Sequence, residues 1–120
     1  TSHMSDIMHL QQTIKKFCDD RDWGQFHNPK DLSISLSLEA AELLEHFQWK
    51  NDDEINTYIA QHKQDIGDEL ADILYWVLLT ANKLEIDLAS SFNSKMEQNE
   101  RKYPVDKSKG SHKKYTEFEQ

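Results

Sequence analysis

The chain has 120 residues, 30% of them charged, with a net charge of −8; this length suits one domain with a single modest core. The acidic balance argues against nucleic-acid binding, which depends on Lys and Arg neutralising phosphates, and no stretch approaches the roughly 20 apolar residues of a membrane span. The single cysteine, Cys18, excludes an internal disulfide and a cysteine-based zinc cluster, and it fits a reducing cytoplasm.

The chain divides into three predicted parts. Residues 1–4 resemble a cloning scar, residues 5–104 are expected to form one helical domain, and residues 105–120 are expected to form a polar, basic C-terminal tail or arm. No basic segment followed by an apolar one is found at the N-terminus, so we expect no signal peptide. The predicted location is the cytoplasm.

Helix is the expected element throughout, because there are only 3 Gly and 2 Pro and no alternating run of β-branched residues. The first helix is predicted from Asp6 to Asp20, with Ser5 as a candidate N-cap. Residues 21–31 are expected to form a long loop, in which Pro29 disfavours helix at Asn28. The fold class is therefore all-α, a protomer of four to five helices.

The later helices carry most of the apolar residues. The second helix is predicted from Leu32 to Gln48, and a short helix from Glu54 to His62 follows a polar turn. The principal helix is expected from Lys63 to Glu85. A last helix runs from Leu88 to Lys102, because Asp87 can cap its start and Pro104 prevents it from continuing far.

Two pairs of acids lie on single faces of the second and principal helices. Positions three apart share a helical face, which joins Glu39 to Glu42 and Glu69 to Asp72. Such a pair is ordinarily a solvated surface feature. Here the rest of both helices is apolar over most of its circumference, which predicts packed neighbours and a second copy of the chain. Four carboxylates facing one another would repel unless a cation lay between them.

The type of ligand indicates which cation this would be. Carboxylate oxygens are hard ligands that favour Mg²⁺, with Mn²⁺ as a substitute, over zinc or copper. A di-iron bundle needs Glu-x-x-His on two helices, whereas His46 follows Glu42 by four residues. Mg²⁺ bound by few carboxylates completes its shell with water and substrate phosphates, so the pattern predicts a phosphate-bearing substrate.

The chain resembles the MazG-like all-α nucleoside triphosphate pyrophosphohydrolases. The first resemblance is the acid motif, in which 26 residues separate Glu42 from Glu69. The second lies in short words similar to the dCTP pyrophosphatase branch. These are RDWGQFHNP at 21–29, FQWK at 47–50, SKM at 94–96, KYP at 102–104 and KYTE at 114–117. The resemblance extends from about Phe17 to Phe118.

The resemblance implies a site and an assembly. It implies that Glu39, Glu42, Glu69 and Asp72 bind Mg²⁺ in a helical homo-oligomer, a tetramer built as a dimer of dimers with sites between subunits. The implied substrate contacts are Trp23, His27 and Trp49 near base and sugar, and Lys95, Asn99, Arg101, Lys102 and Tyr103 near phosphates and ribose. Trp76 stands where the mammalian branch carries tyrosine, which bears on base or sugar preference. Leu38 replaces an acid that many members carry.

The expected reaction is attack of water on the α-phosphorus of dCTP or a modified dCTP, giving dCMP and pyrophosphate and cleaning the nucleotide pool. Glu42 is the expected base, with Glu39 as a second catalytic carboxylate. One alternative is the same chemistry on dUTP or a broad nucleotide set. Another is a non-catalytic helical binding or regulatory oligomer, whose acid stripes pair with basic residues on neighbouring helices. No nucleic-acid or membrane partner is expected.

Overall fold

The computed structural model describes residues 6–110, apart from the side chain of Ser108, and all regular elements within that range are helices. Its elements are α1 (Asp6–Asp20), the short 3-10 helix η1 (Gly24–Phe26), α2 (Pro29–Glu45), α3 (Asp52–Lys83), α4 (Leu88–Lys102) and α5 (Val105–Ser108). No strand occurs among these residues, so the predicted all-α class is confirmed. None of the described helices is both long and apolar enough to cross a membrane.

The bounds of α1 and α4 agree with the sequence prediction, and Asp87 caps α4 by accepting a hydrogen bond from the Ser90 N–H. The predicted N-cap of α1, Ser5, lies outside the described residues. Asp106 and Lys107 are part of α5, so the polar tail predicted from residue 105 begins with a short helix.

The predicted bounds of α2 were wrong at both ends. The helix begins at Pro29, because the Asn28 side chain accepts a hydrogen bond from the Asp31 N–H and proline fits the first turn. It ends at Glu45 rather than Gln48, since the chain turns at His46.

The predicted boundary between two helices at residue 62 is confirmed as a kink. Within α3, two helical segments meet at His62, whose φ of −126° and ψ of 25° are not helical. The Nδ1 atom of His62 bonds to the Tyr58 carbonyl, so the ring helps to hold the kink.

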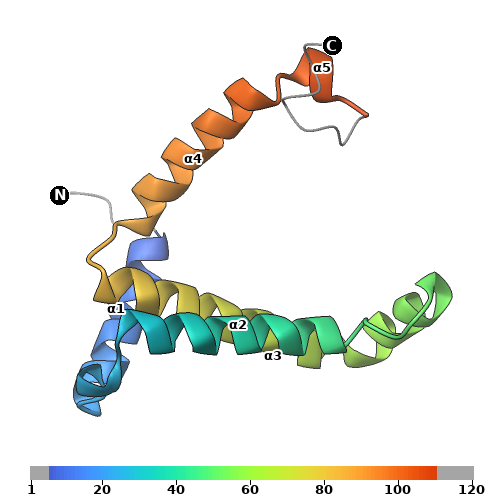
Figure 1. The fold of residues 1–120 in the computed structure, drawn as a ribbon. Helices are drawn as coiled ribbons and strands as arrows, with labels where there is room; N and C mark the ends of the chain where they lie inside the picture. Colours follow the sequence, from blue (N-terminus) through green and yellow to red (C-terminus); the bar gives the residue numbers. More distant parts are fainter. Residues whose placement is uncertain (1–5, 111–120) are drawn as a thin grey trace. The chain divides into compact units, whose positions relative to one another are not determined.

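The chain divides into two compact units with the boundary between Ile86 and Asp87. In the first unit α2 and α3 run antiparallel side by side, and α1 packs on α3 (Figure 1). Cys18, Leu32 and Leu79 bring all three helices together in the buried core, against which Tyr75 and Trp76 pack. The described part of the second unit consists of α4 and α5.

Amide side chains fix the end of α3 against α1. The Gln11 side-chain amide donates to Asn82 Oδ1 and to the Ile86 carbonyl, while Asn82 Nδ2 donates to the Gln11 carbonyl at 2.8 Å. These bonds hold α3 in register on α1, and α3 in turn carries the acids described next.

Candidate functional site

Three glutamates from two helices converge on one point of the first unit. One carboxylate oxygen from each of Glu39 and Glu42 on α2 and of Glu69 on α3 lies within 4.8 Å of the others. The spacing of Glu39 and Glu42 places both on the face of α2 that packs along α3. The sequence therefore identified a true cluster, and it is one that could bind a metal ion.

The burial of this cluster leaves its charge unbalanced. Glu39 Oε2 and Glu69 Oε1 are both buried, and neither has a hydrogen-bond donor among the described residues. A buried oxygen without a donor is costly, and a bound cation removes that cost. The donor set of three carboxylates and the two unpartnered oxygens therefore fit a hard divalent cation.

Electrostatics within the cluster change the protonation of Glu69. A hydrogen bond shared with the Glu39 carboxyl group, partial burial and the negative charges of Glu42 and Glu39 together raise the pKa of Glu69 to about 7. In the metal-free protein, one proton can thus take the place of a cation between α2 and α3.

A cavity of about 410 Å³ adjoins the acid cluster. Its lining comprises Glu42, Glu45, His46, Tyr58 and Glu69. From the sequence, no role was predicted for either His46 or Tyr58. The signal for His46 was its spacing of four residues from Glu42. Tyr58 had no such signal, since its place depends on how α3 passes the end of α2.

Asp72, the fourth predicted ligand, lies one turn beyond Glu69 on α3. It is exposed and is not part of the three-glutamate cluster. The structure thus brings together Glu39, Glu42 and Glu69, and it leaves Asp72 beside them on the same helical face.

The predicted base-binding residues occupy three different environments. Trp23 precedes η1 and packs edge-on against Phe17, with ring centroids 5.5 Å apart. Trp49, in the turn between α2 and α3, is 86% exposed. Trp76 on α3 is half-buried and packs against the core and the Tyr75 ring. Only Trp49 has a ring that is free of packing.

His27 ends η1 and lines a separate cavity of about 310 Å³ that also includes Cys18, Leu79 and Asn82. None of the clustered glutamates lines that cavity. The structure therefore does not bring His27 to the acid cluster within the first unit.

The predicted phosphate and ribose contacts all lie in the second unit. Lys95, Asn99, Arg101 and Lys102 are on α4, and Tyr103 is its C-cap. Asn99 and Lys102 are half-buried, and the others are exposed. The helix presents these side chains within its last three turns, where the positive charges of Arg101 and Lys102 also suit the helix dipole.

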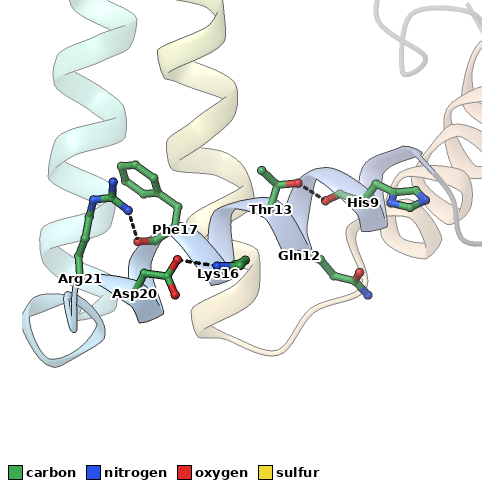
Figure 2. Close-up of a pocket in the computed structure, with 7 residues that line it drawn as sticks. All are labelled: His9, Gln12, Thr13, Lys16, Phe17, Asp20 and Arg21. Atoms are coloured by element: carbon green, nitrogen blue, oxygen red, sulfur yellow. Dashed lines mark hydrogen bonds and ion pairs between the residues drawn. The ribbon is translucent and has the colours of Figure 1, made fainter.

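A further hollow lies along α1 and is lined by His9, Gln12, Thr13, Lys16, Phe17, Asp20 and Arg21 (Figure 2). Its polar groups largely satisfy one another: Lys16 pairs with Asp20, Thr13 donates to the His9 carbonyl, and Arg21 donates to the Phe17 carbonyl. The Arg21 guanidinium also lies 3.9 Å from the Phe17 ring centroid. This hollow therefore lies on α1 and the residue that follows it, where Lys16 and Asp20 pair with each other and Arg21 contacts Phe17.

Comparisons with known proteins show which chains and structures this protein is similar to. Residues 34–118 match the MazG-like family. The chain is 40% identical to dCTP pyrophosphatase 1 from Rattus norvegicus over 96% of its own length and 67% of the relative's, and 38% identical to the Homo sapiens protein over the same shares. The structure resembles a pyrophosphatase from Archaeoglobus fulgidus DSM 4304, with a TM-score of 0.77, 38% identity and coverage of 87% and 97% of the two chains.

Proposed function

The chain belongs to the MazG-like family and is a nucleotide pyrophosphohydrolase, and from that premise we propose that it hydrolyses dCTP, or a modified dCTP, to dCMP and pyrophosphate. The observation that carries the proposal is the convergence of Glu39, Glu42 and Glu69 in a chain whose relatives carry the name dCTP pyrophosphatase 1. Such a reaction removes unwanted dCTP-like nucleotides from the pool.

We propose Mg²⁺ as the resident cation, with Mn²⁺ as a substitute. Glu39, Glu42 and Glu69 would bind it, and Asp72, one turn from Glu69, would complete the set directly or through water. When bound, the ion supplies charge neutralisation on the phosphate chain and lowers the pKa of a bound water. Within the described part of the chain, these three carboxylates fit such an ion, because two of their oxygens are buried without donors.

The carboxylates also supply the proton acceptor that hydrolysis requires. We propose Glu42 as the general base, because it is the exposed member of the cluster and lines the adjoining cavity, where water has access. Glu39 is then the second catalytic carboxylate, which positions the attacking water and holds the cluster together.

Recognition of the nucleotide is assigned to two groups of residues. The base and sugar would be contacted by Trp23, Trp49 and His27. Trp76 would influence which base or sugar is preferred. Contacts to the phosphates and ribose would come from the α4 group of Lys95, Asn99, Arg101, Lys102 and Tyr103. The exposed ring of Trp49 supports the first assignment, and the positive charge near the end of α4 supports the second.

We also propose that the chain acts as a homo-oligomer, a tetramer arranged as a dimer of dimers. Large apolar side chains are exposed along both acid-bearing helices, among them Ile34, Leu38, Leu44, Leu70 and Leu74. A monomer in water rarely leaves such a surface open, and a second copy would cover it.

The cytoplasmic location stays a prediction from the single cysteine.

The test is pyrophosphate release from a panel of nucleoside triphosphates, with and without Mg²⁺. We expect dCTP or its modified forms to react fastest and only with the metal. A best rate with dUTP, or equal rates across the panel, would favour the alternative substrate range. No release from any nucleotide would favour a non-catalytic binding protein.

A non-catalytic binding protein needs cations against the acids, yet the ion pairs within the described residues join Lys15 to Asp19 and Lys16 to Asp20 along α1.

A further inference from the structure

The cavity beside the acid cluster contains very few hydrogen-bond donors. Three of the five side chains that line it, Glu42, Glu45 and Glu69, are carboxylic acids, which only accept hydrogen bonds when ionised. The two that can donate are His46 and Tyr58. An anionic ligand that enters this cavity next to the carboxylate cluster can therefore take a hydrogen bond only from His46 or Tyr58 among the lining side chains.

The His46 ring is held in place by Tyr58. A hydrogen bond joins His46 Nδ1 to the Tyr58 hydroxyl, across the turn between the end of α2 and the start of α3. The Tyr58 ring is itself fixed, because the His62 ring stacks on it with centroids 4.1 Å apart and the Lys50 ammonium lies 4.2 Å from its centroid. Lys50 also donates to the His46 carbonyl at 2.7 Å.

The turn between α2 and α3 is closed without the side-chain contacts of His46 and Tyr58. The N–H of His46 already caps α2 by bonding to the carbonyls of Leu43 and Leu44, and Asn51 caps α3. The turn is therefore closed by backbone and cap bonds alone. A ring fixed at one nitrogen beside the metal cluster is the arrangement that orients a donor toward a ligand.

We propose that His46 contacts the phosphate chain of the substrate through its Nε2–H, and that Tyr58 is the positioning residue that holds the ring for this contact. For this contact the Tyr58 O–H would donate to Nδ1, which leaves the proton of the neutral ring on Nε2. The inference rests on the proposed function, because it takes the ligand to be a nucleoside triphosphate held at Glu39, Glu42 and Glu69.

Two substitutions of His46 separate the two nitrogens. In His46→Asn the amide occupies the position of Nδ1, so the bond from Tyr58 is kept and the donor at Nε2 is lost. In His46→Gln the longer amide reaches the position of Nε2, so the donor is kept and the bond from Tyr58 is lost. Tyr58→Phe removes the hydroxyl alone. The control is His9→Asn, the same change at an exposed histidine on α1.

The main readout is calorimetric binding of the non-hydrolysable α,β-imido analogue of dCTP in the presence of Mg²⁺, with dCMP as the comparison ligand. We expect His46→Asn to weaken analogue binding by about 10-fold to 100-fold, which is the range for a hydrogen bond to a charged group. His46→Gln should restore part of that loss, and Tyr58→Phe should lose less than His46→Asn. Affinity for dCMP and the thermal shift produced by Mg²⁺ alone should stay at the parent's values in each.

If the His46–Tyr58 hydrogen bond only stabilises the turn, the opposite results are expected. His46→Asn would then bind the analogue as tightly as the parent, while His46→Gln and Tyr58→Phe would lower the melting temperature and affect both ligands equally; this pattern overturns the inference. If His46→Asn does not fold, the ratio of analogue to dCMP affinity in Tyr58→Phe decides in the same way, because general damage lowers both.

The outcome for the proposed function is read separately. A parent that binds the analogue but releases pyrophosphate from no nucleotide overturns the proposed function, and the binding comparison still decides the role of His46. If the parent hydrolyses dCTP while His46→Asn binds the analogue normally, the role of His46 alone is overturned. A parent that does not bind the analogue also overturns the role of His46.

Discussion

The carboxyl groups of Glu39 on α2 and Glu69 on α3 approach each other closely enough to share a proton, although the two residues are 30 positions apart in the sequence. One oxygen of each is buried without a donor, and the shared hydrogen bond is the largest cause of the raised pKa of Glu69. A proton and a divalent cation therefore compete for the same place between the helices.

The stability of the metal-free protein should fall as the pH rises. The pKa of Glu69 is near its ordinary value of 4.5 in the unfolded chain and about 7 in the folded one, so the folded state holds the extra proton between these values. The stabilisation is complete below about pH 4.5 and is lost as the pH rises to about 7. Urea unfolding in the presence of a chelator, at a series of pH values, measures the slope.

The variant Glu69→Gln is the control for this slope, because its amide cannot titrate. The pH dependence between about pH 5 and about pH 8 should flatten in the variant. A parent whose metal-free stability is level or rises over this range would show that Glu39 and Glu69 do not share a proton.

Magnesium binding should show the reverse dependence on pH. The cation needs the ionised form of Glu69, so the rise in melting temperature produced by Mg²⁺ should be larger at about pH 8 than at about pH 6. Differential scanning fluorimetry at fixed Mg²⁺ concentration measures it. An equal Mg²⁺ effect at both pH values would mean that the ion binds away from Glu69.

Replacing the proposed ligands should abolish activity and the effect of Mg²⁺ together. In Glu39→Gln, Glu42→Gln, Glu69→Gln and Asp72→Asn the shape is kept and the charge is lost, so each should lower kcat/KM by at least about 100-fold. The three glutamate variants should also be more stable than the parent without metal, because the cluster repels itself. A near-parent rate in Asp72→Asn would remove that residue from the site.

The acid cluster was predictable because helical periodicity needs no tertiary information. Spacing alone placed Glu39 with Glu42, and the apolar surroundings indicated that α2 and α3 would pack with these acids between them. Tyr58 was not predictable from periodicity, because its contact with His46 depends on the path of the turn and on the kink at His62. The early start of α2 follows from a local signal, in which Asn28 caps the helix and Pro29 fits its first turn.

The tryptophans should separate base recognition from packing. Trp49 is 86% exposed, so Trp49→Ala should leave stability within about 0.5 kcal/mol of the parent while raising the KM for dCTP about 5-fold to 100-fold if the ring stacks on the base. Trp23→Ala should also lose about 1 kcal/mol of stability, because its ring packs edge-on against Phe17.

Steady-state kinetics and urea unfolding on the same preparations measure both effects. Tripolyphosphate, which has no base, is the comparison substrate and should be affected much less. Unchanged dCTP kinetics in both variants would show that the two rings have no contact with the nucleotide.

The exposed apolar surface should hold copies of the chain together. Light scattering should give a mass roughly four times the 14.1 kDa of one chain, as closed symmetry of a dimer of dimers requires. Ile34→Lys and Leu74→Lys, which put charge on that surface, should shift the protein to smaller species, whereas the exposed polar change Lys30→Glu should not. A clean monomer at micromolar concentration would contradict the predicted assembly.

The end of α3 offers a route to higher stability that leaves the three-glutamate cluster untouched. Glu85 has a φ of 56°, in the left-handed region that favours glycine. The Ile86 N–H bonds to the Ala81 carbonyl and the Glu85 N–H to the Asn82 carbonyl, which is the Schellman arrangement with Glu85 in the position that glycine usually occupies. Glu85→Gly should therefore raise the free energy of unfolding by about 0.5–1 kcal/mol, the relief of strain exceeding the added freedom of the unfolded chain.

Two further variants of Glu85 assign the cause of that gain. Glu85→Ala removes the same side chain but keeps the unfavourable φ, so it should give no increase, while Glu85→Asn should fall between Ala and Gly because asparagine tolerates this region. Urea unfolding at constant pH without metal measures all three. Equal gains for Ala and Gly would mean that the strain comes from the Glu85 side chain and not from the backbone. That side chain lines the cavity with His27. Because Gln11 also bonds to the Ile86 carbonyl, a loss of stability in all three would instead show that Glu85 helps to hold this turn on α1.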